Sequence, residues 1–159
     1  MSRDSHHLPR QLISGRFESY ERPFLMKIMI VDDHIGMRKM LRSLVSTTDS
    51  EIRECEDGPK AVALYEVFQP DLVLMDVLLG NSDGLAATRQ ITFAHPEARI
   101  MILTEHESAR LEKAAAEAGA CAFLSKDRLL ELPGLVAELG TSRMGLEAQG
   151  PDVARGSIG

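Results

Sequence analysis

The stretch "KIMIVDDHIGMRKMLRSL" (residues 27–44) contains a strand pattern, an acidic pair and a helical pattern in direct succession. The apolar, β-rich run at 28–31 ends at two adjacent carboxylates, Asp32 and Asp33. From Met37 to Val45, apolar residues recur at intervals of three and four, which indicates a helix with one apolar face. The stretch therefore predicts a buried strand whose carboxyl end presents two acidic side chains, followed by a helix.

The alternation of strand and helix continues beyond this stretch to about Gly140. Apolar, β-rich runs occur at 28–31, 51–55, 71–75, 99–103 and 120–124, with helical patterns between them. Three of these runs are almost continuously apolar, which is typical of parallel strands covered on both faces. We therefore expect an α/β fold, a flavodoxin-like three-layer sandwich with a five-stranded parallel sheet of order 2-1-3-4-5 and five helices.

Glycine and proline mark the expected helix ends. Gly119 and Gly140 each follow a helical run and are expected to end it in the left-handed conformation. Pro133 should end or restart the last helix near Leu132, because proline cannot donate a main-chain hydrogen bond.

The length and the changes in pattern indicate one domain with two extensions. The chain has 159 residues, of which 44% are hydrophobic, enough for a single core. We expect a domain at 26–140. Residues 1–25 lack periodicity and are predicted to form an irregular N-terminal extension, and the Gly- and Ser-rich residues 141–159 are predicted to form a flexible tail.

The composition argues against several classes of protein. The formal net charge is −6, no basic block is present, and aromatic residues make up only 4%, so direct binding to nucleic acid is not expected. The apolar runs are too short to span a bilayer, and no secretory signal precedes them, so a cytoplasmic location without membrane association is expected. Cys55 and Cys121 form no metal-binding pattern and are interpreted as reduced core residues.

A third carboxylate, Asp76, follows the run at 72–75 and precedes a glycine-bearing loop. If the first and third strands are neighbours, about 5 Å apart, Asp76 lies beside Asp32 and Asp33 at the ligand-binding edge of the sheet. Two unit charges about 4 Å apart repel by about 4 kcal/mol at an effective dielectric of 20, so the cluster must take up protons or hold a cation. Mg²⁺, which prefers oxygen ligands, is the cofactor that this cluster favours. Without Asp76, the Asp-Asp-His sequence is also explained by the second Asp or His34 capping the next helix.

Two further polar residues follow the last two predicted strands. Thr104 ends the run "IMILT", and Lys126 follows the run "CAFLSK". Each is unremarkable alone, since a threonine at a strand end often caps a turn and a lysine in a loop is usually solvated. Beside the acidic cluster they instead supply a hydroxyl and an ammonium group suited to a phosphoryl oxygen. His34 and His106 are expected nearby, where exposed loop histidines are common and neither has an assigned role.

Residues 27–140 resemble the receiver domain of bacterial two-component response regulators, because "IVDDH", "VLMDVLLGNSDG", "ILT" and "FLSK" occur in this order with suitable spacing. The resemblance implies that Asp76 accepts a phosphoryl group from a histidine kinase. It also implies that Asp33 and Asp76 bind Mg²⁺ directly, that Asp32 binds it through water, and that the main-chain carbonyl of Leu78 is a further ligand.

The resemblance also implies roles for three residues near the end of the domain. Thr104 would hydrogen-bond the phosphoryl group, and Lys126 would form an ion pair with it. Thr104 would move toward the phosphoryl group on phosphorylation while Phe123 turns inward, so both are candidate switch residues. Phe123 is equally well explained as an ordinary core residue.

Three positions depart from the receiver pattern. Gly80 stands where many receivers have proline, which predicts a looser loop, and Glu105 stands where a small residue is usual, which predicts shielding of the site or slower phosphotransfer. Asp127 follows Lys126, and the pair "KD" resembles receivers that are joined to a LuxR-type helix-turn-helix domain. Too few residues follow Gly140 for such a domain, so a stand-alone receiver is expected.

The leading hypothesis is a regulatory phosphoacceptor domain, not an enzyme in the usual sense, that assists its own phosphotransfer and dephosphorylation. Its expected partners are a histidine kinase or histidine phosphotransferase and a downstream protein that binds the switched surface, and a homodimer is left open. One alternative is a phosphate shuttle or sink in a multistep relay. A second is an aspartyl-nucleophile phosphatase of the haloacid dehalogenase type, although Leu78 occupies the position of its general acid. A third is a scaffold that never uses the pocket.

Overall fold

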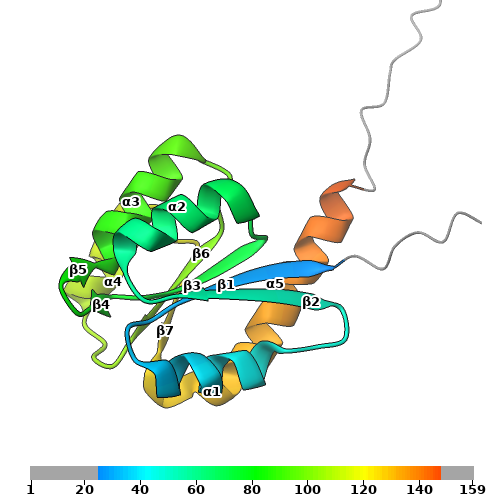
Figure 1. Ribbon diagram of the computed structural model, residues 1–159, viewed down its shortest axis with the longest axis horizontal. Coiled ribbons are helices and arrows are strands. Elements are labelled where there is room, and N and C mark those ends of the chain that lie inside the picture. The colour runs from blue at the N-terminus through cyan, green and yellow to red at the C-terminus, as the bar shows by residue number, and fades with distance from the viewer. Residues whose placement is uncertain (1–24, 148–159) are drawn as a thin grey trace, which may run out of the picture.

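The computed structural model describes residues 25–147, which form a central parallel sheet with helices on both faces (Figure 1). The sheet contains β1 (Met26–Val31), β2 (Ser50–Cys55), β3 (Leu72–Asp76), β6 (Ile100–Thr104) and β7 (Ala122–Ser125) in the order β2-β1-β3-β6-β7. Counted along the chain, these five strands have the order 2-1-3-4-5. The predicted flavodoxin-like fold is therefore confirmed.

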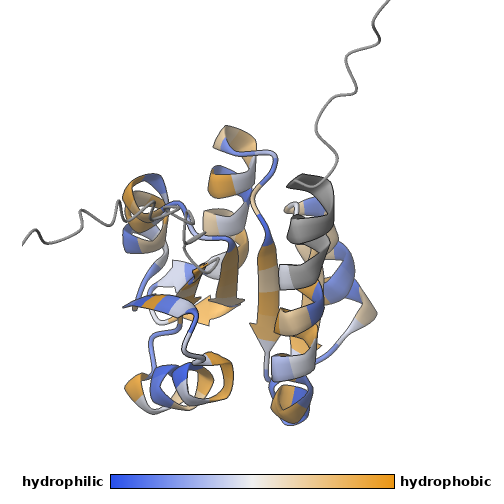
Figure 2. Cartoon of the chain, turned by 90° about the vertical axis from the view of Figure 1, so that its right-hand side faces the viewer, coloured by the Kyte–Doolittle hydropathy of each residue, from blue (hydrophilic) through white to orange (hydrophobic). Residues whose placement is uncertain are grey.

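Within residues 25–147, five α-helices and one 3-10 helix connect the strands or follow the last of them. They are α1 (Ile35–Val45), α2 (Gly58–Phe68), α3 (Gly84–Ala94), α4 (Ala109–Glu117), the 3-10 helix at Lys126–Glu131, and α5 (Leu132–Glu147). Apolar residues of α2, α3 and α4 pack on one face of the sheet, and those of α1 and α5 pack on the other. Figure 2 shows hydrophobic strands between these two helical layers. No helix in the described part of the chain is long and apolar enough to cross a membrane.

The alternation of side chains along β1 explains how the sheet supports two cores. Met29 and Val31 are buried on the face with α2, α3 and α4, whereas Ile28 and Ile30 are buried on the face with α1 and α5. Successive residues of a strand point to opposite faces, so a run of four apolar residues is required where both faces are covered. This burial fixes β1 on both faces up to Val31, directly before Asp32, the first residue of the acidic pair.

The helix ends agree with the sequence at two positions. Gly119 has a φ of 92° just after α4, as predicted for a glycine that ends a helix in the left-handed region. Pro133 lies in the first turn of α5, which restarts at Leu132 after the 3-10 helix. Proline is tolerated there because main-chain N–H groups in the first turn have no helical acceptor.

The end of the last helix differs from the prediction. Helix α5 continues through Gly140 to Glu147, into the segment that we predicted to be a flexible tail, and Gly140 is helical rather than left-handed. Glycine within a helix costs only about 1 kcal/mol relative to alanine, and no proline occurs between Gly140 and Pro151. The remainder of the predicted tail, 148–159, and residues 1–24 of the predicted extension lie outside the described residues.

A short antiparallel hairpin after β3 was not predicted. It pairs β4 (Leu78–Leu79) with β5 (Ser82–Asp83), and its turn contains Gly80 at a φ of 60°. Glycine is favoured at this position because other L-residues rarely adopt a positive φ. The loop at Gly80 is thus a defined turn, whereas the sequence suggested only a looser connection.

His95 ends α3 and links it to α2 through an ion pair that should titrate. Its Nε2 atom lies 2.8 Å from Glu66 Oε1, its Nδ1 atom lies 3.5 Å from Glu97 Oε1, and its ring contacts that of Tyr65. The hydrogen bond to Glu66 raises the pKa of His95 above 6.5. Because the folded-state pKa is the higher one, the stabilisation is complete below pH 6.5 and is lost as the pH rises through the folded-state value.

NMR titration of the His95 ring should therefore give a pKa above 6.5 in wild type. Glu66→Gln should move it back toward 6.5, because the amide keeps the hydrogen-bonding oxygen but removes the charge. An unchanged His95 pKa in Glu66→Gln would show that this pair does not set the titration.

Candidate functional site

The carboxyl ends of β1, β3, β6 and β7 meet at one edge of the sheet, where the following loops enclose a cleft of about 620 Å³. The lining residues are Asp32, Asp33, His34, Met37, Asp76, Val77, Leu78, Gly80, Thr104, Glu105, His106 and Lys126. All three predicted carboxylates, the predicted hydroxyl and the predicted ammonium group thus line one cleft. They come from four separate strand ends, which shows that the parallel sheet assembles the site.

The three carboxylates form a cluster of the size needed for one metal ion. One oxygen each from Asp32, Asp33 and Asp76 lies within 4.8 Å of the other two. Asp32 is fully buried and Asp76 is 6% exposed, whereas Asp33 is exposed and leaves one side of the cluster open to solvent. Oxygen ligands on one side and room for water on the other suit Mg²⁺, which commonly keeps several waters beside one or two carboxylates. The donor set therefore fits the predicted cofactor.

Lys126 is the cation that partly neutralises this cluster. Its Nζ atom lies 2.9 Å from Asp32 Oδ2 and 3.1 Å from Asp76 Oδ2, and its side chain is only 8% exposed. Three carboxylates and one ammonium group leave a formal charge of −2, which a single divalent cation would balance. The prediction that Lys126 belongs to the site, and is not a solvated loop residue, agrees with this geometry.

For both Asp76 and Lys126, burial and the ion pair between them shift the pKa in opposite directions. Burial is the largest effect on Asp76 and raises the pKa of its carboxyl group, with a further increase from Asp32 that Lys126 opposes. Burial lowers the pKa of the Lys126 ammonium, but its hydrogen bonds and ion pairs with Asp32 and Asp76 raise it overall. Lys126 therefore remains charged and supplies a permanent cation next to Asp76.

The loop after β1 combines helix capping with the acidic site. His34 is the N-cap of α1, because its Nδ1 accepts a hydrogen bond of 3.3 Å from the Met37 main-chain N–H. The Asp32 carboxylate accepts a hydrogen bond of 2.8 Å from the His34 main-chain N–H, and the exposed Asp33 is left to face the cleft. The capping alternative is thus correct for His34, and it coexists with the acidic cluster.

Thr104 lies at the end of β6 and is 5% exposed. Its hydroxyl accepts a hydrogen bond from the His106 main-chain N–H and donates one to the His106 carbonyl, both at 3.2 Å. The capping interpretation of Thr104 therefore describes this conformation, although the residue also lines the cleft. Glu105 is exposed at the rim and shares the cleft, so its side chain has solvent available to it.

Leu78 and Phe123 occupy positions with different surroundings. Leu78 follows Asp76 by two residues and starts the hairpin, where it is 74% exposed and lines the cleft. Phe123 in β7 is partly buried against the core shared with α2, α3 and α4. This packing agrees with the core interpretation of Phe123 and leaves its switching role as a prediction.

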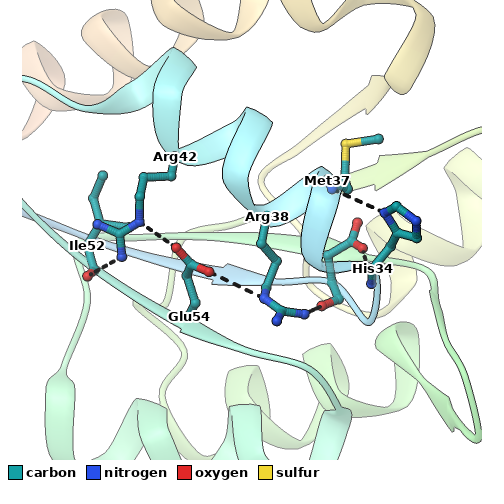
Figure 3. Close-up of polar contacts among 7 residues, drawn as sticks. His34, Met37, Arg38, Arg42, Ile52 and Glu54 are labelled. Atoms are coloured by element: carbon teal, nitrogen blue, oxygen red, sulfur yellow. Dashed lines mark hydrogen bonds and ion pairs between the residues drawn. The ribbon is translucent and has the colours of Figure 1, made fainter.

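Sequence reasoning missed an interaction that reaches the acidic loop from α1. Arg38 donates a hydrogen bond of 2.7 Å from Nη1 to the Asp32 main-chain carbonyl, and its Nε lies 3.3 Å from Glu54 Oε2 (Figure 3). Arg42, one turn later, binds the other oxygen of Glu54 and the Ile52 carbonyl. A signal was present, because two arginines four residues apart, outside the apolar stripe, face an acidic residue on the adjacent edge strand.

Comparison with known proteins shows which sequence family and which relatives this chain is similar to. The sequence model of the response regulator receiver domain matches residues 28–134. The chemotaxis protein CheY of Listeria monocytogenes is 34% identical over 112 residues, which cover 67% of this chain and 94% of CheY. The transcriptional regulatory protein YdfI of Bacillus subtilis is 39% identical over 103 residues, which cover 64% of this chain and 48% of YdfI, so the match spans about half of that protein.

Solved structures show the same architecture. A two-component response regulator of the LuxR family from Aurantimonas sp. SI85-9A1 has a TM-score of 0.63 and 32% identity, covering 81% of this chain and 92% of that one. The signal receiver domain of NarL from Mycobacterium tuberculosis has a TM-score of 0.70 over 76% of this chain and 100% of that one, with 23% identity, and supports the fold alone.

Proposed function

The chain belongs to the response regulator receiver domain family of two-component systems, and on this premise we propose that Asp76 accepts a phosphoryl group in a Mg²⁺-dependent reaction. The donor is a phosphohistidine of a histidine kinase or a histidine phosphotransferase. A carboxylate oxygen of Asp76 forms a bond to phosphorus as the bond between phosphorus and the imidazole nitrogen breaks. The imidazole keeps the electron pair and takes up a proton.

The position of Asp76 is the observation that supports this role most strongly. Its carboxylate lies 3.1 Å from Lys126 Nζ, belongs to the three-carboxylate cluster, and lines an open cleft of about 620 Å³. A carboxylate attacks an anionic phosphoryl group effectively only if nearby cations reduce the repulsion and the reactants are held in line. Lys126 supplies one such cation, and the residual formal charge of −2 calls for a second.

The metal would be held by residues that the resemblance to receivers indicates. Asp33 and Asp76 would be direct ligands, Asp32 would act through water, and the main-chain carbonyl of Leu78 would complete the protein contribution. Bound there, Mg²⁺ would screen charge between Asp76 and the phosphoryl oxygens. The open side of the cluster at Asp33 gives the ion and the donor access from solvent.

Phosphorylation would then act on the fold through Thr104. The phosphoryl group adds about 1.5 to 2 negative charges to the cleft, which attract nearby donors. The Thr104 hydroxyl would exchange its hydrogen bonds with the His106 main chain for one to the phosphoryl group, and Phe123 would turn inward. The phosphoryl group can shift the equilibrium between the two conformations only by as much as its interaction free energy differs between them.

The output proposed for the switched domain is protein binding in the cytoplasm. The proposed surface is formed by α4, β7 and α5, around the edge of the sheet where β7 carries Phe123 and the adjacent β6 ends at Thr104. A phosphatase of the haloacid dehalogenase type is not favoured, because Leu78 has no proton to donate to a leaving group two residues after Asp76.

Removal of the metal tests this proposal directly. Wild-type protein incubated with acetyl phosphate and Mg²⁺ should gain one phosphate by intact mass spectrometry, and excess EDTA should slow incorporation by about 100-fold or more, since electrostatic stabilisation of several kcal/mol is lost. Restoring free Mg²⁺ should restore the rate. Incorporation at an equal rate in EDTA would contradict the proposed metal-assisted reaction.

A further inference from the structure

We propose that Arg38 is a positioning residue that holds the Asp32–His34 loop in its metal-binding conformation. The inference rests on the proposed function, because it concerns the Mg²⁺ site of that reaction. Its basis is the pair of contacts made by one guanidinium group, a hydrogen bond of 2.7 Å to the Asp32 main-chain carbonyl and an ion pair of 3.3 Å with Glu54.

The main-chain carbonyl of Asp32 lies just beyond the end of β1, where the regular ladder of the sheet stops. Asp32 is 0% exposed, so this carbonyl is removed from solvent and needs a donor inside the protein. The Arg38 Nη1 atom provides that donor. Without it the loop would have to shift so that water could reach the carbonyl.

Arg38 is itself held in place from the neighbouring strand. Glu54 on β2 accepts from Arg38 Nε, and the next residue, Cys55, offers its carbonyl to the Asp32 main-chain N–H at 3.2 Å. Two consecutive residues of β2 thus hold both main-chain polar groups of Asp32, one directly and one through Arg38. Figure 3 shows Arg38 and Arg42 extending from α1 to the two sides of Glu54.

The hydrogen bond from Arg38 to the Asp32 carbonyl affects the metal-binding cluster because Asp32 and the next residue, Asp33, both belong to that cluster. Asp32 also accepts hydrogen bonds from the His34 main chain at 2.8 Å and from Lys126 at 2.9 Å, so every polar group of Asp32 has a partner. Asp33 is the next residue in the chain. A displacement of the Asp32 carbonyl would rotate the following peptide and move Asp33 relative to Asp76, which would spread the three-carboxylate cluster.

If Arg38 positions the loop, its loss should weaken Mg²⁺ binding, whereas its charge alone predicts tighter binding after its loss. The two explanations can therefore be told apart by experiment. A cation near an acidic site repels Mg²⁺, so loss of Arg38 should tighten metal binding if only charge mattered. Glu54 neutralises much of this charge, because it pairs with both Arg38 and Arg42. Arg42→Ala is therefore a matched control, since it removes an equal charge from the same helix and the same Glu54 without touching Asp32.

Isothermal titration with Mg²⁺ at fixed ionic strength should separate the two arginines. Arg38→Ala is expected to weaken Mg²⁺ binding about tenfold, whereas Arg42→Ala should remain within about twofold of wild type. Arg38→Lys, which keeps the charge but cannot bind the carbonyl and Glu54 with a fork of donors, should fall between them. In the phosphorylation assay, Arg38→Ala should raise the half-saturating Mg²⁺ concentration by a similar factor with little change in the rate at saturating Mg²⁺.

A second measurement uses the protein without metal. Amide hydrogen exchange at His34, whose N–H donates to Asp32, should be accelerated about tenfold or more in Arg38→Ala and unchanged in Arg42→Ala. Equal Mg²⁺ affinities for the two alanine variants, or tighter binding by Arg38→Ala, would overturn the inference. If wild type binds Mg²⁺ but is never phosphorylated, the proposed function fails and the comparison of variants still tests Arg38.

Discussion

Asp76→Asn is expected to abolish incorporation of phosphate from acetyl phosphate in the presence of Mg²⁺. The amide that replaces the carboxylate has no anionic oxygen to attack phosphorus, and the substitution removes one negative charge from the three-carboxylate cluster. The expected loss is complete within detection, at least about 1000-fold. Asparagine has nearly the same shape, so the variant should retain the fold, which circular dichroism and thermal unfolding can confirm.

Asp83→Asn is the matched control for this substitution. Asp83 is also an acidic residue shortly after β3, at the end of the β4–β5 hairpin, but it caps α3 by accepting a hydrogen bond of 2.8 Å from the Leu85 main-chain N–H. Asparagine caps helices about as well as aspartate, so the stability should change little. Full phosphorylation of Asp83→Asn together with none in Asp76→Asn assigns the acceptor. Labelling that persists in Asp76→Asn would refute the assignment.

Gly84→Ala is expected to be the most destabilising of the small substitutions near the site. A β-carbon at this position would lie 1.8 Å from the Asp76 main-chain oxygen and 2.9 Å from its carbonyl carbon. Neither contact can be relieved by a side-chain rotation, so the start of α3 must move away from the end of β3. The Gly84 main-chain N–H would then also lose its hydrogen bond of 2.9 Å to the Val77 carbonyl.

The expected cost is about 3 kcal/mol or more, a large part of a typical domain stability of about 5–15 kcal/mol. Urea unfolding monitored by circular dichroism gives the free energy of unfolding. Gly134→Ala is the control, because a β-carbon at Gly134 would have no atom within 4 Å apart from its chain neighbours and the backbone of its own helix. Gly134 lies in α5, where alanine should be neutral or stabilising by up to about 1 kcal/mol. Similar stabilities for the two variants would show that the close approach at Gly84 is not rigid.

The sequence predicts the strands and the acidic site well because both depend on local patterns joined by a simple topology. The apolar run at 28–31 is buried on both faces of the sheet, as is typical of a parallel strand between two helical layers. Once the first and third strands are adjacent, Asp32 and Asp76 must lie at the same edge. Lys126 could be placed there for the same reason, since it follows the last strand of the sheet.

Other features depend on contacts that no local pattern specifies. The interaction of Arg38 with the Asp32 carbonyl requires the exact approach of α1 to β2, and a long side chain outside the apolar stripe normally faces solvent. The close contact at Gly84 arises only when the hairpin brings α3 back against β3. The end of α5 was misplaced because glycine weakens a helix without preventing it.

Chemical mapping of the phosphorylated residue tests the central claim most directly. Protein phosphorylated with acetyl phosphate and Mg²⁺ would be reduced with borohydride, which converts an acyl phosphate of aspartate to homoserine, and then digested and sequenced by mass spectrometry. The account predicts homoserine at position 76 and at no other aspartate, and none when Mg²⁺ is omitted. Homoserine at Asp32 or Asp33, or none in fully phosphorylated protein, would contradict it.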